Sequence, residues 1–400
     1  MKKLAFFTEG RFIKDSNGLI FSEASFDNTL WMKYLSSFSE IIVFARVINI
    51  DGYIGDNDFI SNIKNVSFIE IPYYIGAKQY FLNYLNIKSV ILSGIISNKD
   101  CVFVLRVPGL IGSIASQYLN KLNIPYAAEV VGDPEDVFSR GSFNHPLRKL
   151  FQYITVNQLK RTVGNAKAVL YVTKFTLQSK YKAPKNAYQV YASDVILPDN
   201  EIMIDYKKWQ LKKEYSIISI GSLAQLYKAP DILLKSIDYI NKKYEHINVK
   251  LTWLGDGVYK DKMLSLASDL GILDQIFFLG NVSRDQVFKY LENSDIFVLA
   301  SRTEGLPRVI VEAMGKGIPI VGTSVGGIPE LLHCDVLVPK DDFIALAEMI
   351  VRLISDENFY NSQAERNLKE SGVFKNSELS IKRNEFYKNI SNSFFSEGGL

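Results

Sequence analysis

The 400-residue sequence has few of the residues that form cross-links and metal sites. It contains two cysteines, Cys101 and Cys334, each in an apolar stretch, and three scattered histidines. Two cysteines give no disulfide framework and fit a reducing compartment. Histidines this far apart in the chain argue against a structural zinc site.

The chain also lacks a long apolar run, an internal repeat and a low-complexity tract. No stretch reaches the roughly 18 apolar residues that indicate a membrane span. Met1–Phe7 resembles the start of a signal peptide, but Glu9 and Arg11 interrupt its apolar region, so we expect a first β-strand instead. We therefore expect a cytoplasmic protein, able at most to associate with the inner face of the cell membrane.

Charge is unevenly distributed, although the net charge is only +3. Residues 1–195 carry a net charge of +7 and the remaining residues −4, and no acidic residue occurs between Asp136 and Asp194. The basic residues of this span form either solvated helix faces or a surface for an anionic partner. No nucleic-acid motif accompanies them, so an anionic membrane surface or a diphosphate-bearing lipid is a better candidate than nucleic acid.

Short apolar segments alternate with helical stretches along nearly the whole chain, which predicts an α/β protein with parallel sheets. Two successive sets of strands indicate two Rossmann-like, doubly wound domains facing across a cleft, where a ligand site is usual. The strands are expected at residues 3–8, 41–45, 66–71, 102–106, 126–131 and 168–172, and then at 216–220, 250–254, 275–279, 296–299, 318–321 and 336–338.

A polar, lysine-bearing segment, Val195–Glu214, is the expected hinge between the two domains. The first domain would span residues 1–195 and the second residues 196–377. Residues 377–395 have Ile381, Phe386, Tyr387 and Ile390 on one side of a helix. This pattern predicts a closing helix, from about residue 378 to the C-terminus.

The most informative segment is Ser301–Gly317, which places Glu304 and Glu312 around the start of a helix. Pro307 suits the first turn, and Glu312 should lie about two turns inside. A helix start suits phosphate, because it offers free N–H groups and the positive end of the dipole. Carboxylates beside it would instead accept hydrogen bonds from hydroxyl groups. Phosphate next to several hydroxyls describes a nucleotide sugar.

Other polar residues follow the remaining strands of the second half. Lys228 follows the first strand and can donate to phosphate, although an exposed lysine in a turn is the simpler interpretation. Val282 belongs to a loop, Gly280–Ser283, that could offer backbone groups to a base. Gly326 and Gly327 permit close backbone approach after the fifth strand. Each signal is weak alone, but all of them fall at strand ends, where open parallel sheets bind ligands.

These motifs together resemble the retaining GT-B glycosyltransferases of the group 1, or family 4, type. The resemblance covers most of residues 215–340 and is carried by five segments: Phe278–Val282, Asp295–Ser301, Glu304–Pro307, Glu312–Ala313 and Gly326–Leu331. It weakens in the first half, where Arg106–Gly109 and Glu129–Pro134 resemble bacterial polysaccharide-assembly members. It implies that the C-terminal domain binds the nucleotide sugar, that the N-terminal domain binds the acceptor, and that the closing helix returns to the N-terminal domain.

By the same resemblance, Glu312 would hold the ribose hydroxyls and Glu304 the hydroxyls of the donor sugar. The backbone of Gly305, Leu306 and Pro307 would face the sugar and phosphate. Lys228 would neutralise the diphosphate, where negative charge develops as the glycosidic bond breaks. No metal or other cofactor is expected, and the chain has no Asp-x-Asp pair at a strand end.

Three positions depart from the family pattern. Ser222 stands where many relatives have an arginine, so a second cation would come from elsewhere, with Arg106, Arg140 and Lys174 as candidates. Asp133 lies where many relatives have a histidine, and either contacts acceptor or sugar or forms an Asp-Pro turn. The usual N-terminal double glycine is reduced to Gly18, which either lets the loop approach the phosphates or makes an ordinary turn.

These observations predict a retaining, metal-independent glycosyltransferase that moves a hexose-type sugar from a nucleoside-diphosphate sugar. The expected acceptor is a glycan or a polyprenyl-diphosphate-linked sugar in cell-surface polysaccharide synthesis, such as capsule or O-antigen. Two alternatives remain open. One is another GT-B enzyme, such as a sugar-nucleotide epimerase or a phosphorylase. The other is a catalytically silent GT-B subunit that binds a partner enzyme, which the departures at Ser222 and Asp133 would suit.

Overall fold

The computed structural model describes residues 1–22, 26, 28–55, 59–138 and 146–394. The chain forms two compact units. Unit 1 is built from Met1–Glu135, Pro146–Asp194 and the end of the chain from Ser380, and unit 2 is built on Val195–Leu379. None of the described helices combines the length and apolar character needed to cross a bilayer.

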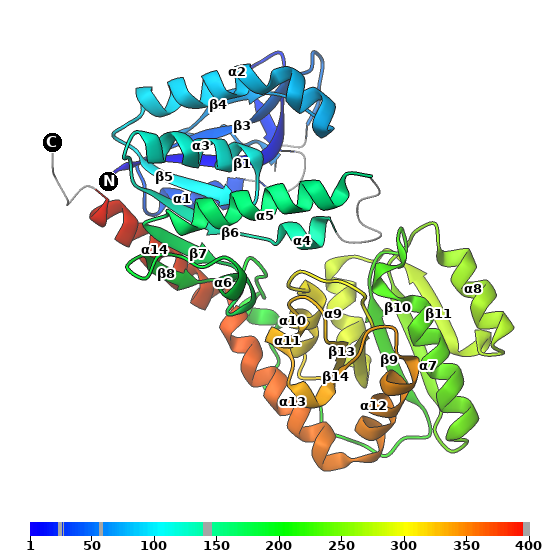
Figure 1. Cartoon of the computed structure of the whole chain (residues 1–400). Helices are drawn as coiled ribbons and strands as arrows, with labels where there is room; N and C mark the ends of the chain where they lie inside the picture. Colours follow the sequence, from blue (N-terminus) through cyan, green and yellow to red (C-terminus); the bar gives the residue numbers. More distant parts are fainter. Residues whose placement is uncertain (23–25, 27, 56–58, 139–145, 395–400) are drawn as a thin grey trace. The chain divides into compact units, whose positions relative to one another are not determined.

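Unit 1 contains an eight-stranded sheet in which the strands are parallel except for β2 (Figure 1). The order is β4-β3-β1-β5-β6-β7-β8, with β2 paired to β1. The strand β1 runs further than the sequence predicts, because an irregularity between Phe7 and Arg11 lets pairing with β3 resume. The strands are β1 (Lys3–Lys14), β2 (Ile20–Ser22), β3 (Glu40–Asn49), β4 (Val66–Pro72), β5 (Val102–Val107), β6 (Tyr126–Val130), β7 (Ala168–Tyr171) and β8 (Tyr188–Tyr191).

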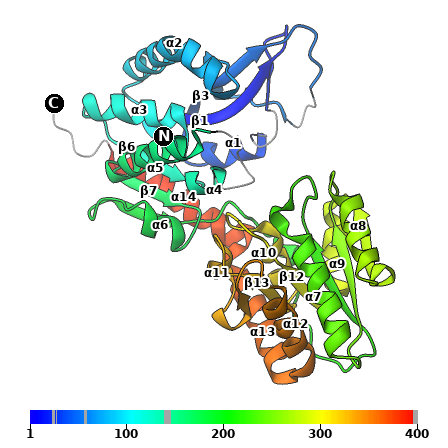
Figure 2. The ribbon, with the colours of Figure 1, turned by 45° about the vertical axis from the view of Figure 1, so that its right-hand side comes forward.

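Three helices form a layer on one face of this sheet: α2 (Gly76–Ser97), α3 (Leu110–Lys121) and α5 (Arg148–Gly164). They lie side by side in both views (Figures 1 and 2), and α3 contacts both of the others. Each helix links strands that progress across the sheet in the same direction, and right-handed crossovers then place the helices on the same face. Phe7, Phe44 and Phe103 belong to the apolar core beneath this layer. The shorter helices of the unit are α1 (Asn28–Leu35), α4 (Pro134–Val137) and α6 (Thr176–Lys180).

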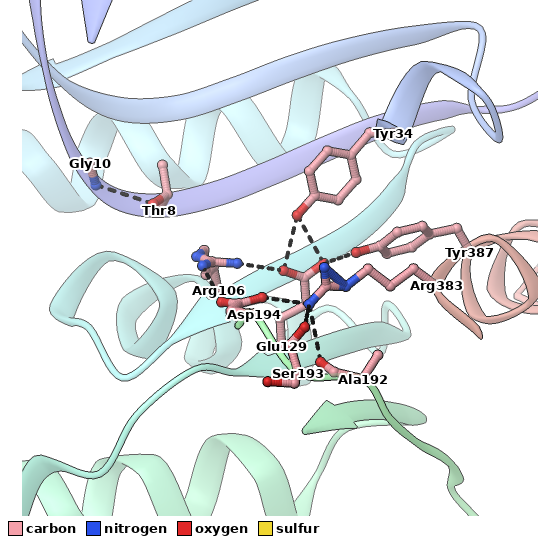
Figure 3. A network of polar contacts seen from close by, with 10 residues as sticks. All are labelled: Thr8, Gly10, Tyr34, Arg106, Glu129, Ala192, Ser193, Asp194, Arg383 and Tyr387. Atoms are coloured by element: carbon pink, nitrogen blue, oxygen red, sulfur yellow. Dashed lines mark hydrogen bonds and ion pairs between the residues drawn. The ribbon is translucent and has the colours of Figure 1, made fainter. Parts of the chain in front are cut away.

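A buried carboxylate attaches the last helix, α14 (Asn376–Ser393), to unit 1 (Figure 3). Glu129, on β6, is 1% exposed and accepts hydrogen bonds from the hydroxyls of Tyr387 at 2.7 Å and Tyr34 at 3.1 Å. Arg106, on β5, donates to the same carboxylate at 3.2 Å. Since a buried charge is tolerated only when it is paired and hydrogen-bonded, Glu129 requires α14 to be in place.

The same network continues to Asp194, the last residue of unit 1 before the chain enters unit 2 (Figure 3). Arg106 donates to one oxygen of Asp194 at 2.7 Å, and Arg383 of α14 donates to the other at 2.6 Å. Burial alone would raise the pKa of Asp194, but the charges of Arg106 and Arg383 outweigh it and lower the pKa. The network therefore holds β5, β6, the segment at Asp194 and α14 together.

Unit 2 contains a six-stranded parallel sheet in the order β11-β10-β9-β12-β13-β14. The order reverses direction between β9 and β12, which makes the edge beyond their carboxyl ends the expected ligand site. The strands are β9 (Tyr215–Ile220), β10 (Val249–Leu254), β11 (Ile276–Gly280), β12 (Ile296–Leu299), β13 (Ile320–Thr323) and β14 (Leu337–Val338). The main helices are α7 (Pro230–Lys243), α8 (Lys260–Asp269), α9 (Arg284–Asn293), α10 (Arg308–Gly315), α11 (Ile328–Leu331), α12 (Phe343–Ser355) and α13 (Glu357–Ser371).

The predicted α/β class is confirmed, and every strand expected from the sequence is present, with bounds that differ by at most a few residues except for β1, which ends six residues later. Two strands were not predicted. The strand β2 has only three residues, and β8 is largely exposed, so neither gives a continuous apolar run. One helix boundary was wrong: Pro307 precedes α10 as its N-cap, so Glu312 lies just over one turn inside the helix and not two.

Candidate functional site

The central contact of unit 2 joins the ends of its two middle strands. Lys228 belongs to a short 3-10 turn, Leu226–Lys228, after β9, and Glu304 belongs to the loop after β12. The Lys228 Nζ lies 2.5 Å from the Glu304 Oε1, and both residues are more than 90% buried. Ser301 donates its hydroxyl to the same oxygen at 2.5 Å. Sequence reasoning placed Lys228 and Glu304 at neighbouring strand ends, and the structure brings them into direct contact.

An arginine fixes the loop that carries Glu304. The guanidinium of Arg302 forms two hydrogen bonds with the carboxylate of Asp231, at 3.0 and 2.8 Å, at the start of α7. The guanidinium also donates to the carbonyl of Leu226 at 2.6 Å. The backbone N–H of Arg302 donates to the carbonyl of Tyr227 at 2.7 Å. A bidentate pair has both high strength and a fixed geometry. The loop after β12 and the turn containing Lys228 are therefore held at a fixed separation.

Two glycines support the same loop. Gly326 has a φ of +53°, and a Cβ at this position would lie 1.7 Å from the carbonyl oxygen of Glu304. The Gly327 N–H donates to the carbonyl of Gly305 at 2.8 Å. No larger residue could occupy position 326 without moving the backbone, because the conflicting atom belongs to the main chain. The close backbone approach expected at these glycines is therefore an approach to the Glu304 loop of the protein itself.

Glu312, on α10, is the second carboxylate of the site, and it differs from Glu304 in having no hydrogen-bond or ion-pair partner among the described residues. It is 6% exposed, and no hydrogen bond or ion pair to its carboxylate is found among the described residues. Burial raises its pKa, and the charges of Arg284 and Arg308 lower it by less. Its oxygens are not among the fully enclosed polar atoms that lack a hydrogen-bond partner, so they stay accessible and can accept hydrogen bonds from a ligand.

The residues between the two glutamates expose backbone toward the same edge of the sheet. Gly305 is exposed, and a Cβ at this position would meet no atom within 4 Å, whereas Leu306 and Pro307 pack partly or fully into the unit. Pro307 ends the loop as the N-cap of α10. The first N–H groups of α10 therefore follow directly on a loop that is open at Gly305.

The flanking loops hold the other predicted residues of unit 2. Ser222 follows β9, and its hydroxyl accepts a hydrogen bond from the N–H of Ala224 at 3.1 Å, which shapes the turn that leads to Lys228. Gly221, just before it, lies against the aliphatic part of Lys228. Val282 is half-buried and packs against the core, one residue before the Ser283 cap of α9.

Asp133 of unit 1 is engaged by protein groups. One carboxylate oxygen accepts hydrogen bonds from the Tyr181 hydroxyl at 2.5 Å and the Glu135 N–H at 2.9 Å. The other accepts from the Lys180 ammonium at 2.6 Å. These contacts match the turn interpretation of the Asp-Pro pair, and any contact of Asp133 with acceptor or sugar stays a prediction.

The remaining unit 1 candidates have defined local settings. Gly18 has a φ of +83° and lies in the turn between β1 and β2, where its N–H donates to the carbonyl of Asp15 at 3.1 Å. Arg106 is committed to the network of Figure 3. Lys174 lies 5.2 Å from the ring centre of Phe175, and Arg140 lies outside the described residues.

One group of possible metal ligands occurs among the described residues. His333, Cys334 and Asp335 are consecutive and exposed, and one ligand atom from each lies within 4.8 Å of the others. Cys334 is exposed and not in the core-like setting that its sequence context predicts, although the short 3-10 turn that it starts, Cys334–Val336, ends on the buried Val336. Cys101 is buried, as expected.

Sequence reasoning missed the residues that organise the site. Ser301 and Arg302 stand three and two residues before Glu304. The hydrogen bond of Ser301 to Glu304 is local, whereas that of Arg302 to Asp231 joins distant parts of the chain. Arg284 stands at the first position of α9, and its influence on Glu312 depends on how α9 packs on α10. Arg308 stands at the first position of α10, four residues before Glu312, so this pair could have been read from helical spacing. An arginine three residues after a strand end is the signal that could have drawn attention to Arg302.

Comparison with known proteins assigns the unit that carries this geometry. Residues 203–370 match the family model of the glycosyl transferases group 1. The chain is 28% identical to Protein CapJ of Staphylococcus aureus over 382 residues, which cover 94% of this chain and 93% of that protein. It is 32% identical to the Vi polysaccharide biosynthesis protein VipC/TviE of Salmonella typhi over 151 residues, which cover 36% of this chain and 25% of that protein.

Solved structures share the fold over the full length. Anabaena Alr3699/HepE in complex with UDP superposes with a TM-score of 0.65 at 16% identity, and the match covers 97% of this chain and 100% of that one. The two parallel α/β units thus have the GT-B architecture. Residues 203–370 thus have the sequence of a group 1, also called family 4, glycosyltransferase, as the motifs at residues 278–331 predict.

Proposed function

We propose that this glycosyltransferase takes its sugar from a nucleoside-diphosphate sugar bound at the edge of unit 2 beyond β9 and β12. The observation that carries the proposal is the contrast between two buried carboxylates, of which Glu304 is paired with Lys228 and Glu312 has no partner among the described residues. A ligand with a phosphate between two sets of hydroxyls suits this arrangement. The ribose would supply the hydrogen bonds that Glu312 lacks, and the donor sugar would donate to Glu304.

Lys228 has the central role in this proposal. Its ammonium has three donors, of which Glu304 uses one, so the others can reach the oxygens of a diphosphate. Glu304 and Ser301 fix the position of the ammonium before any ligand arrives. A cation held in advance where negative charge develops stabilises the transition state without reorganisation during the reaction.

The reaction breaks the bond between the anomeric carbon and the diphosphate oxygen. That oxygen takes the electron pair and leaves with the nucleoside diphosphate. The acceptor hydroxyl attacks from the same face and passes its proton to the leaving phosphate, so the anomeric configuration is retained. In this scheme Lys228 and the N–H groups at the start of α10 stabilise the negative charge that develops on the leaving diphosphate, and no metal is required.

We further propose that the donor sugar is of the hexose type and that the acceptor belongs to cell-surface polysaccharide synthesis. The acceptor would be a glycan or a polyprenyl-diphosphate-linked sugar, bound by unit 1. The name of the Vi polysaccharide biosynthesis protein supports this class of product. UDP-glucose is the first donor to test, because structures of HepE, which has the same fold, contain UDP and UDP-glucose.

The test combines donor binding with donor hydrolysis. UDP, GDP, dTDP and CMP, and their sugars, are screened for a rise in melting temperature, because a ligand of the native state stabilises it. With the best donor, Glu304→Gln and Lys228→Met should each reduce sugar release to water or acceptor by at least about 100-fold. Lys235→Met, a change of an exposed lysine on α7, is the matched control and should keep full activity.

The silent subunit and the epimerase each have their own outcome in this assay. A wild-type chain that binds no nucleotide sugar, or that binds one without any turnover, would be a silent partner subunit. A product in which the sugar stays on the nucleotide with altered configuration would identify an epimerase. Unchanged turnover in folded Glu304→Gln and Lys228→Met proteins would remove both residues from the mechanism.

A further inference from the structure

The helical layer of unit 1 contains only basic charges. The helices α2, α3 and α5 carry two, one and four lysine or arginine residues, and none of them contains an aspartate or glutamate. This absence extends beyond the acid-free span between Asp136 and Asp194, because α2 and α3 precede it in the sequence. Ordinary solvated helices mix both signs of charge, so a layer with one sign favours an anionic partner.

The outward side of α2 is apolar in its first half. Phe81, Leu82 and Leu85 are exposed by 66%, 77% and 77%. Their spacing places them on one side of the helix, whereas Ile87 and Ile91 face the core. A single exposed leucine is ordinary, but three large apolar side chains on one helix turn form a contiguous patch. Lys78 is exposed one turn before them.

The first half of α5 has the same character. Leu150, Tyr153 and Ile154 are exposed by 50%, 71% and 41%. Arg148 and Lys149 adjoin them at the start of the helix. Apolar side chains with basic residues beside them are the composition of segments that bind at a membrane interface, where tyrosine is also favoured.

Topology brings the two patches to the same edge of unit 1. The helix α2 follows β4 and α5 follows β6, and these strands are parallel members of one sheet. The first half of each helix therefore lies near the carboxyl ends of the strands, the edge where open α/β sheets bind ligands. Both helices are on the same face of the sheet in Figures 1 and 2.

We infer that this surface, formed by Phe81, Leu82 and Leu85 of α2 with Leu150 and Tyr153 of α5, inserts into an anionic lipid bilayer. The charge of the layer selects this occupant: a second copy would bring the same basic layer against itself, and like charges repel. Apolar insertion and attraction to anionic headgroups add together in peripheral binding. The inference goes beyond the proposed reaction and does not depend on it, since binding is measured without a sugar donor.

The experiment measures co-sedimentation of the full chain with two kinds of vesicle: phosphatidylcholine alone, and equal parts of phosphatidylcholine and phosphatidylglycerol. Wild type should bind the anionic vesicles and be released by salt. The double variant Leu82→Ser/Leu85→Ser should weaken partitioning by about 100-fold, because each buried leucine contributes about tenfold. Lys149→Glu changes the charge by two units and should weaken it by up to about 30-fold, through charge alone.

Leu211→Ser is the matched control, because Leu211 is 82% exposed but lies in unit 2. It should leave vesicle binding unchanged, and all variants should keep the wild-type melting temperature and donor hydrolysis. Three results overturn the inference: no binding of wild type to anionic vesicles, equal binding of the double variant, or a change of the double variant in self-association and not in lipid binding. Analytical ultracentrifugation provides the last measurement.

Discussion

Replacing Glu312 by glutamine should stabilise the ligand-free protein and weaken nucleotide binding at the same time. The side chain is buried, with 6% of the residue exposed, and none of the described residues pairs with its carboxylate. Burial raises its pKa, although Arg284 and Arg308 counteract the effect. Glutamine has nearly the same shape and removes the charge, so the cost of burying that charge disappears with it.

The stability gain should be at most about 1 kcal/mol, because the carboxylate oxygens are not fully enclosed and a carboxamide still buries polar atoms. In a unit of this size that corresponds to a rise of about 2–4 °C in melting temperature. For binding, two ribose hydroxyls would lose charge-assisted acceptors, with a loss of about 2 kcal/mol, or roughly 30-fold in Kd.

The gain in stability should also depend on pH. Because the pKa of Glu312 is raised in the folded state, its protonated form stabilises the fold fully below the unfolded value of 4.5. This contribution is lost as the pH rises through the folded pKa. Wild type and Glu312→Gln should therefore differ at neutral pH and converge as the pH falls toward the unfolded value.

The assay is a set of thermal melts at neutral and acidic pH, with and without the best nucleotide, together with calorimetric titration of that nucleotide. Glu365→Gln is the matched control, because Glu365 is an exposed glutamate on α13 of the same unit. It should change neither quantity. Equal nucleotide affinity of wild type and Glu312→Gln would falsify the ribose role, and an unchanged or lower melting temperature would refute the argument from burial.

Two further substitutions test the supports of the two units. Gly326→Ala should displace the Glu304 loop, because the new Cβ would lie 1.7 Å from the Glu304 carbonyl oxygen, and turnover should fall by about 100-fold. The control is Gly271→Ala, at a glycine with a similar φ of +71° and open space around it. It should cost only about 1 kcal/mol of backbone strain and keep normal turnover. Tyr387→Phe removes a 2.7 Å hydrogen bond to the buried Glu129. It should lower the free energy of unfolding, measured by urea denaturation, by about 1–3 kcal/mol. An unchanged free energy of unfolding would show that the carboxylate does not need α14.

The fold was largely predictable because its strands are buried on both faces. Segments such as Ile296–Leu299 are wholly apolar, and a run of that kind between helical stretches is readable without tertiary information. The strand β8 was not, because Tyr188–Tyr191 is exposed or half-buried and depends on β7 for its place in the sheet. Local pattern therefore predicts central strands better than edge strands.

The site was predictable only to the level of strand ends. Lys228 and Glu304 could be assigned to neighbouring loops, because parallel strands deliver their carboxyl ends to the same edge. Their direct ion pair, and the bonds that hold Arg302 on Asp231, join residues more than 70 positions apart, and no local pattern encodes such pairs. Glu129 gave a readable signal, since it is a charged residue inside the apolar strand Tyr126–Val130.

The two glutamates also explain why the site can be rigid at one end and unsatisfied at the other. Glu304 is fixed by Lys228, Ser301 and the backbone around Gly326, so its position is set before a donor binds. Glu312 lies on a helix that is itself buried, and the helix holds its carboxylate in place although none of the described residues pairs with it. A nucleotide sugar that contacts both carboxylates would meet a Glu304 already fixed in position at its sugar end. At its ribose end it would donate hydrogen bonds to the unpaired carboxylate of Glu312. Binding energy would then come mainly from the nucleotide, which leaves the contacts around Lys228 to act on the breaking bond.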